Sequence, residues 1–192
     1  DKKSNLKLKK FVPASGAASR MFKFLNEFLN EFKLGEESIN AYINRKKDKN
    51  LPIFLVAKDK FPFYNEILEE AKSSLPEYGN WEKDTRDFGF IKTMLSPKYF
   101  DFSNKPKGVL PFHKYDNHTA TAIEEHLNEC AFYAASNGQS NLHFTVSEEH
   151  QNDFETIINE VKPRIEKQTN TEINVKYSYQ NKATDVIAVD LD

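Results

Sequence analysis

Hydrophobic and polar positions follow two different periods along this chain, and the changes of period divide it into strands and helices. Residues 8–14, LKKFVPA, form a short apolar run. The apolar positions that follow recur at steps of three and four, which puts them on one face of a helix: Met21, Leu25, Phe28, Leu29 and Phe32. The pattern predicts a central strand over residues 8–14 and a helix over residues 17–33, with Gly16 in the turn between them.

The rest of the chain divides into a middle segment and an alternating second half. Residues 34–104 read as a helical insert, in which Pro and Gly separate three amphipathic pieces at 38–46, 61–75 and 84–95. From residue 108 onward, strand and helix periods alternate. The pattern predicts strands at 108–112 (GVLPF), 141–147 (NLHFTVS), 173–180 (INVKYSYQ) and 185–191 (DVIAVDL), and helices at 119–136 and 148–167.

This order of elements predicts the fold class. Strands that alternate with helices are typical of an α/β fold with a mostly parallel sheet between two helical layers. We therefore expect residues 1–192 to form a single three-layer, Rossmann-like domain that carries the helical insert. Because the sequence stops directly after a strand-like run, we also expect it to be an incomplete part of a longer protein.

The composition of the chain limits its expected partners and cellular location. The chain has 27 Lys and Arg against 29 Asp and Glu, so its net charge of -2 gives no field for attracting nucleic acid. No apolar run approaches the roughly 20 residues that span a bilayer, so no membrane partner is expected. The single cysteine, Cys130, fits a reducing compartment and hence a cytoplasmic location.

The loop after the first strand carries the candidate chemistry. Residues 15–21 read SGAASRM, so small side chains would let a ligand approach the backbone closely. Free N–H groups at the start of a helix favour an anion, and Arg20 would add a fork of donors for phosphate oxygens. The alternative is a tight strand-to-helix turn that is packed with small residues and binds nothing.

Two motifs together carry a resemblance. The small-residue loop that ends in Arg20, followed by Pro106-Lys107-Gly108, resembles the sugar nucleotidyltransferases, especially the UDP-sugar pyrophosphorylases. More closely, a set of segments in matching order is similar to an uncharacterised bacterial domain family of unknown function, which itself resembles those enzymes: FVPASGAASRMFK, KGVLPFHKY, EEHLNE, HFTVSEEH and YSYQNKATDVIAVD.

The resemblance implies a GT-A-type, nucleotide-diphospho-sugar transferase-like fold that binds a nucleoside triphosphate or a nucleotide sugar. Carried over by position, Arg20 and Lys107 would be the catalytic residues that contact phosphate, and Gln180 matches a glutamine at a strand end in those enzymes. The implied nucleotide-binding residues are Ala14, Ser15, Gly16, Ala17, Ala18, Ser19, Arg20 and Gln180.

Mg²⁺ is the cofactor that such a reaction would use, and it needs one or two carboxylates. Asp190 and Asp192, in a D-x-D arrangement, are the candidates, with Asp185 near them; the alternative is that these acids are simply solvated. The spacing of the five histidines predicts no zinc site. His126 with Glu124 and Glu125 predicts a helix surface, and Cys130 a buried, inert thiol.

Two classes of function stay open on this sequence. The first is an enzyme that transfers a nucleotidyl group to a sugar phosphate. The second is a nucleotide or sugar-nucleotide binding module that catalyses no reaction. They differ in whether an acidic metal site lies beside Arg20 and Lys107. In either class, the inserted helices could form a lid or a lateral layer.

Overall fold

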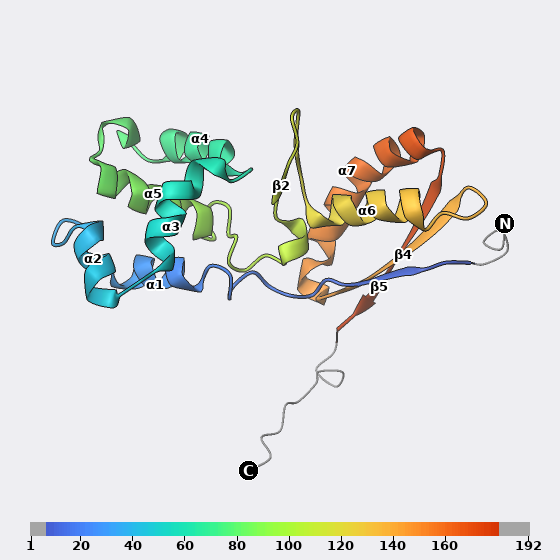
Figure 1. Ribbon diagram of the computed structural model, residues 1–192, viewed down its shortest axis with the longest axis horizontal. Coiled ribbons are helices and arrows are strands. Elements are labelled where there is room, and N and C mark those ends of the chain that lie inside the picture. Colours follow the sequence, from blue (N-terminus) through green and yellow to red (C-terminus); the bar gives the residue numbers. More distant parts are fainter. Residues whose placement is uncertain (1–6, 181–192) are drawn as a thin grey trace, which may run out of the picture. The chain divides into compact units, whose positions relative to one another are not determined.

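The computed structural model describes residues 7–180 of the 192-residue chain. Its residues group into two compact units, coloured along the sequence in Figure 1. The sheet unit contains residues 7–16, 106–109 and 121–180 of the described chain, and the helical unit contains residues 17–105 and 110–120. The single-domain expectation and the insert boundaries 34–104 stay predictions.

The sheet unit is built on three parallel strands. They are β1 (Lys10–Pro13), β4 (Gln139–Val146) and β5 (Glu172–Tyr179), in the order β1-β4-β5. Val12 is aligned with Phe144, and Phe144 with Tyr177. Because all three strands run the same way, their carboxyl ends meet at one edge. The parallel mixed α/β arrangement and the strands expected at 141–147 and 173–180 are confirmed.

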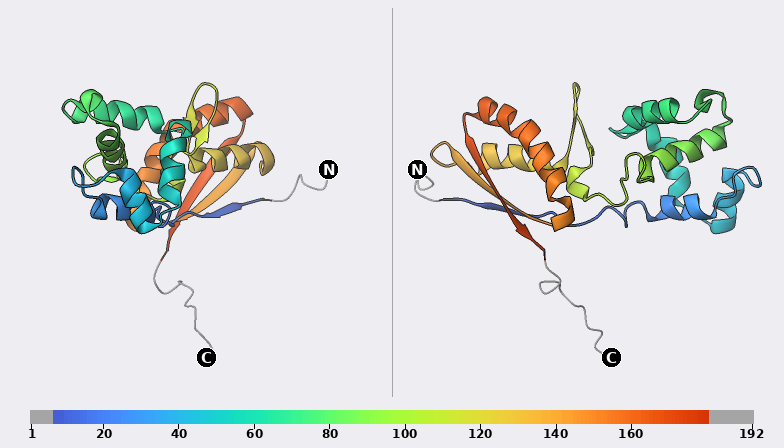
Figure 2. Two further views of the ribbon diagram at one scale, coloured as in Figure 1. Left: turned by 60° about the vertical axis from the view of Figure 1, so that its left-hand side comes forward. Right: turned by 180° about the vertical axis from the view of Figure 1, so that it is seen from behind.

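Two helices cover one face of this sheet, as the three views show (Figures 1 and 2). They are α6 (Ala122–Tyr133), whose amino end is capped by the Thr121 hydroxyl, and α7 (Gln151–Thr169), which contains Pro163. Both helices were expected from the sequence. Buried side chains of the two helices and of alternate sheet residues form one core, including Ile123, Leu127, Cys130, Leu142, Phe144, Val146, Phe154, Ile158 and Ile165.

One expectation about the sheet is wrong within residues 7–180, and another stays a prediction. β1 pairs with β4 alone and so lies at an edge of the described sheet, because β4, the longer strand with one fully buried face, takes the centre. Taken by itself, the described sheet unit has two layers, the sheet and the helices α6 and α7, so the three-layer arrangement is not confirmed. The helix expected to cover the second face after β1 belongs to the helical unit.

The helical unit contains the helix expected after β1, the helices expected at 38–46, 61–75 and 84–95, and one helix, Asn50–Ala57, that the periodicity did not predict. They are α1 (Lys23–Glu31), α2 (Ile39–Lys46), α3 (Asn50–Ala57), α4 (Tyr64–Ser74) and α5 (Lys83–Leu95), with short 3₁₀ turns at Lys58–Lys60 and Tyr78–Asn80. Ser38 caps α2 by accepting the Ala41 N–H at 3.2 Å. Aromatic rings fill the interior: Phe28, for example, lies 4.8 Å from Phe32 and 5.2 Å from Tyr42 between ring centroids.

Two further elements differ from the prediction. The helix expected over 17–33 begins only at Lys23, because the Ala18 carbonyl accepts the N–H groups of Met21 and Phe22 in a separate turn. Residues 108–112 form no strand. Lys107–Val109 is a 3₁₀ turn, Pro111 has no N–H to give a ladder, and pairing starts afterwards, in the antiparallel hairpin of β2 (His113–Lys114) and β3 (Thr119–Ala120).

Within residues 7–180, no helix combines the length and the apolar composition that crossing a membrane requires. The strand expected at 185–191 lies outside the described residues.

We expect Gly108→Ala to destabilise the sheet unit by about 1 kcal/mol, at the low end for an overpacked core. A Cβ at this position would lie 3.2 Å from the ring of Phe154 and 3.6 Å from Ile123. Urea denaturation followed by circular dichroism measures the change. An unchanged midpoint would show that the Phe154 ring moves aside at no cost.

Candidate functional site

The carboxyl edge of the sheet unit brings three chain segments together. The ladder continues beyond the strands, since Ala14 N–H donates to Thr145 O at 2.8 Å and Gln180 N–H to Val146 O at 3.1 Å. The Ser15 hydroxyl donates to the Gln180 side-chain oxygen, and Ser147 Oγ lies 3.5 Å from Ser15 O. Residues far apart in the sequence therefore meet at the edge where open α/β sheets bind their ligands.

Lys107 is held next to this loop by its main chain. Its N–H donates to the carbonyl of Gly16 at 3.0 Å. The side chain of Lys107 is exposed, and its ammonium pairs with no carboxylate among residues 7–180. The structure thus collects five of the residues implied by the resemblance at one edge: Ala14, Ser15, Gly16, Lys107 and Gln180.

Gly16 is a glycine that the described fold does not require. Its φ is not left-handed, and a Cβ built on it meets no atom within 4 Å. Gly108 differs, because its Cβ position is crowded by Phe154 and Ile123. A side chain would therefore fit at Gly16 without a clash inside the protein, and the free space lies at the exposed carboxyl edge.

Charge is distributed unevenly along this edge. The segment after β4 carries Glu148 and Glu149 in a 3₁₀ turn, and His150 lies 3.5 Å from both Glu149 and Asp153 carboxylate oxygens. This acidic side repels an anion from the start of α7. Lys107, on the β1 side, attracts one.

The remaining loop residues lie in the helical unit. Ala17, Ser19 and Arg20 are exposed, and Ala18 is buried with its N–H bonded to Lys105 O at 3.0 Å. Arg20 forms no ion pair or hydrogen bond with the described residues. Because Arg20 and Lys107 belong to different units, their convergence on one phosphate stays a prediction.

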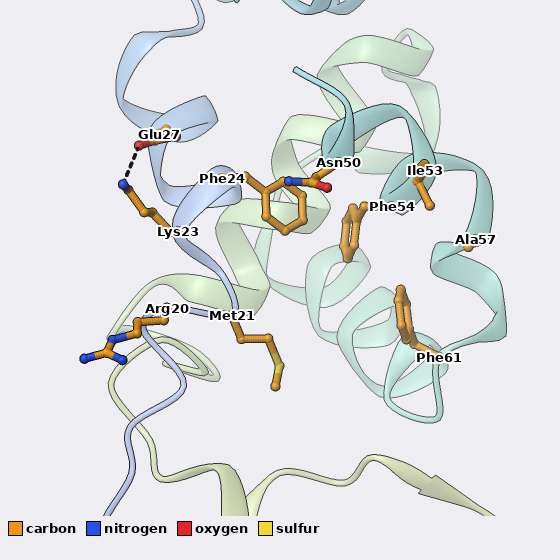
Figure 3. Close-up of a pocket in the computed structure, with 10 residues that line it drawn as sticks. All are labelled: Arg20, Met21, Lys23, Phe24, Glu27, Asn50, Ile53, Phe54, Ala57 and Phe61. Atoms are coloured by element: carbon orange, nitrogen blue, oxygen red, sulfur yellow. Dashed lines mark ion pairs between the residues drawn. The ribbon is translucent and has the colours of Figure 1, made fainter. Parts of the chain in front are cut away.

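Arg20 instead lies at the rim of a pocket of about 560 Å³ between α1 and α3. Figure 3 shows the side chains of Met21, Phe24, Phe54 and Phe61 gathered around the hollow, while Arg20 extends away from the rings. The sequence prediction missed this pocket. The sequence feature that could have indicated it is the segment NLPIFLVA of α3, which is apolar on all sides and so cannot bury every apolar side chain. In the structure, Ile53 is 67% exposed.

The expected magnesium ligands, Asp190 and Asp192, lie outside the described residues, as does Asp185. Within residues 7–180, no group of three or more His, Cys, Asp and Glu side chains could hold a metal ion. The expected Mg²⁺ site therefore stays a prediction.

Two titratable residues of α6 have buried side chains. Cys130 is fully buried, and burial raises the pKa of its thiol, as expected for an inert cysteine. Glu124, expected on the helix surface, is only 5% exposed and pairs with Arg164 of α7. The prediction for Glu124 is wrong because α7 packs over this turn of α6, so that Arg164 covers the carboxylate.

The face of the sheet opposite α6 and α7 carries a small polar cluster. The Nε2 atom of His143 lies 3.0 Å from Ser178 Oγ, which lies 3.2 Å from Thr145 Oγ1, and the ring of Phe11 lies 5.5 Å from the His143 ring. His143 lies on the opposite side of β4 from Leu142 and Phe144, which are buried.

Comparisons with known proteins give one match. No curated protein and no solved structure matches the chain. A sequence profile of the family described as Domain of unknown function (DUF4301) matches residues 1–192. The resemblance to UDP-sugar pyrophosphorylases is untested by these comparisons and stays a prediction. Since the profile covers the whole sequence, the chain belongs to the family Domain of unknown function (DUF4301).

Proposed function

We propose that the carboxyl edge of the sheet unit binds the phosphate groups of a nucleoside triphosphate or a nucleotide sugar. The observation that carries the proposal is the open position of Gly16 beside Lys107. A side chain at Gly16 would clash with no described atom, so packing does not explain why this residue is a glycine. The Gly16 carbonyl also accepts the N–H of Lys107, which keeps the two residues side by side. A phosphate that approaches the backbone closely gives this glycine a reason.

The side chains at the edge suit such a ligand. Lys107 supplies a positive charge that no described carboxylate neutralises. The Ser15 hydroxyl and the Gln180 amide, already in contact, can donate to phosphate oxygens or to a sugar hydroxyl. A charge-assisted hydrogen bond from Lys107 would be the strongest single contact.

The reaction we propose on this ligand is nucleotidyl transfer. Its support is the parallel α/β sheet, whose carboxyl edge gathers Ser15, Lys107 and Gln180, together with the resemblance. An oxygen of a sugar phosphate attacks the α-phosphorus of the triphosphate in line, a new P–O bond forms, and pyrophosphate leaves with the electrons of the broken bond. Positioning and charge compensation dominate such a step. Lys107 holds phosphate during transfer and offsets its negative charge.

The experiment is a thermal-shift and calorimetric titration with UTP, CTP, GTP, ATP and UDP-sugars, with and without Mg²⁺. A ligand at 100 times its Kd should raise the free energy of unfolding by about 2.7 kcal/mol. We expect Gly16→Val to weaken binding about tenfold, because its side chain fills the space that the phosphate would occupy, while the unfolding midpoint without ligand stays unchanged.

Gly79→Val is the matched control. Gly79 is also exposed, without a left-handed φ and with no atom within 4 Å of a Cβ, but it lies in the helical unit. It should leave affinity unchanged. If none of the nucleotides binds, or if Gly16→Val binds as tightly as the native protein, the phosphate site at this edge is wrong.

A further inference from the structure

Two adjoining pockets in the helical unit differ in chemistry. The first is the hollow of about 560 Å³ shown in Figure 3, whose apolar lining is Met21, Phe24, Ile53, Phe54, Ala57 and Phe61. The second is smaller, about 340 Å³, and three of its lining residues are lysines, Lys46, Lys47 and Lys49. Both are lined by Phe24, Glu27 and Asn50, so they meet along these residues.

The apolar pocket is built from aromatic side chains that contact one another. The ring of Phe54 lies 6.1 Å from the Phe24 ring, edge to face, and 5.6 Å from the Phe61 ring, stacked. Such a lining offers few hydrogen-bonding groups for sugar hydroxyls. Its volume is within the usual range of small-molecule sites, and its surface suits a hydrocarbon chain.

The smaller pocket carries an excess of positive charge. Lys46 pairs with Glu31 at 2.5 Å, but Lys47 and Lys49 pair with no carboxylate among the described residues. The two carboxylates of the lining are already engaged: Glu27 lies 3.7 Å from Lys23, and Asp48 accepts the N–H groups of Asn50 and Leu51. Across a chain with a net charge of -2, this is a local cationic patch.

We propose that these two pockets form one binding site for an amphipathic anion, whose hydrocarbon chain fills the apolar pocket and whose carboxylate or phosphate lies against Lys47 and Lys49. Because the two pockets share lining residues, a single molecule can occupy both. The site lies wholly in the helical unit and is independent of the phosphate site proposed for the sheet unit.

The probe is decanoate, kept below its micellar concentration and titrated calorimetrically into the full chain. We expect saturable binding. Octanoate, two methylenes shorter, should bind about 15-fold more weakly because less apolar surface is buried. Acetate should not bind, because it has no chain to fill the apolar pocket.

Variants separate the two halves of the site. Ile53→Asp places a carboxylate at the apolar pocket and should weaken decanoate binding at least tenfold. Val56→Asp is the matched control, since Val56 is 84% exposed on the same helix and lines neither pocket, so it should leave affinity unchanged. Lys47→Asn with Lys49→Gln should weaken binding about fivefold, and Asn tolerates the left-handed φ of 51° at residue 47.

Lys92→Gln, on the exposed side of α5, removes one positive charge elsewhere in the unit and should have no effect. Absence of decanoate binding would overturn the proposal. So would equal losses for Ile53→Asp and Val56→Asp. Binding to phosphatidylglycerol vesicles without binding to dissolved decanoate would also overturn it, because the surface would then contact a bilayer instead of enclosing one molecule.

Discussion

Phe144→Ala is expected to lower the free energy of unfolding of the sheet unit by about 3 to 5 kcal/mol, the usual cost of emptying a core position of this size. Phe144 is fully buried on the central strand β4. Its ring lies 5.6 Å from that of Phe154 on α7 and 6.4 Å from that of Tyr177 on β5. Its removal would therefore empty the centre of the layer between the sheet and the helices.

The natural cysteine reports this unfolding selectively. Cys130 is the only cysteine, it is fully buried in the same core, and a thiol reagent reaches it only when the sheet unit opens. If labelling follows the population of the open form, Phe144→Ala should speed it by roughly 150- to 5,000-fold. The rate is measured with an excess of reagent at fixed pH.

Phe11→Ala is the matched control for this measurement. Phe11 stands on β1 on the opposite face of the same sheet and is 60% exposed, so its removal should change stability by less than about 0.5 kcal/mol. Equal labelling rates for the two variants would contradict the placement of the core between the sheet and α6 with α7.

The second half of the fold follows from local pattern. In β4 every second residue is buried, and Thr121 and the apolar steps of α6 mark a helix that starts and ends within a few residues of the prediction. Short connections make neighbouring parallel strands and a crossover helix the natural arrangement. Helices and strands with a clear hydrophobic periodicity in their own sequence can thus be predicted.

The errors occur where a partner elsewhere decides the structure. Residues 108–112 look like a buried strand because Val109 and Leu110 are apolar. The structure instead has a 3₁₀ turn over Lys107–Val109, in which Gly108 lies against Phe154. Glu124 looks like a surface residue until Arg164 of α7 covers it. The periodicity of a segment depends on that segment alone, so it cannot predict contacts with residues that are distant in the sequence.

The candidate site shows the same limit. The resemblance identified Ser15, Lys107 and Gln180 as functional candidates, but the spacing along the chain does not reveal that Ser15 contacts Gln180 or that the Lys107 N–H bonds to Gly16. The lysines at 47 and 49 and the aromatic rings of α1 and α3 were missed because they belong to no motif. Their common pocket exists only after the helices pack.

Lys107→Ala is expected to weaken nucleotide binding by roughly 10- to 150-fold, the loss of one charge-assisted hydrogen bond worth about 1.5 to 3 kcal/mol. The main-chain bond from Lys107 to Gly16 does not depend on the side chain, so the substitution removes the charge and leaves the loop in place. The exposed ammonium pairs with no described carboxylate, so stability should not change. Calorimetry with the tightest nucleotide of the panel measures the affinity.

Lys9→Ala is the control that decides between a local contact and a general effect of charge. Lys9 is exposed just before β1, at the amino end of the sheet, whereas Lys107 stands at the carboxyl edge. Both variants remove one positive charge, but only the loss of Lys107 removes a contact at the proposed site. Equal affinities for the two variants would mean that the cation at the carboxyl edge has no direct contact with phosphate. A large loss confined to Lys107→Ala, with affinity restored in part by Lys107→Arg, would place the phosphate beside Gly16, because Arg keeps the charge but changes the reach and geometry of the donor.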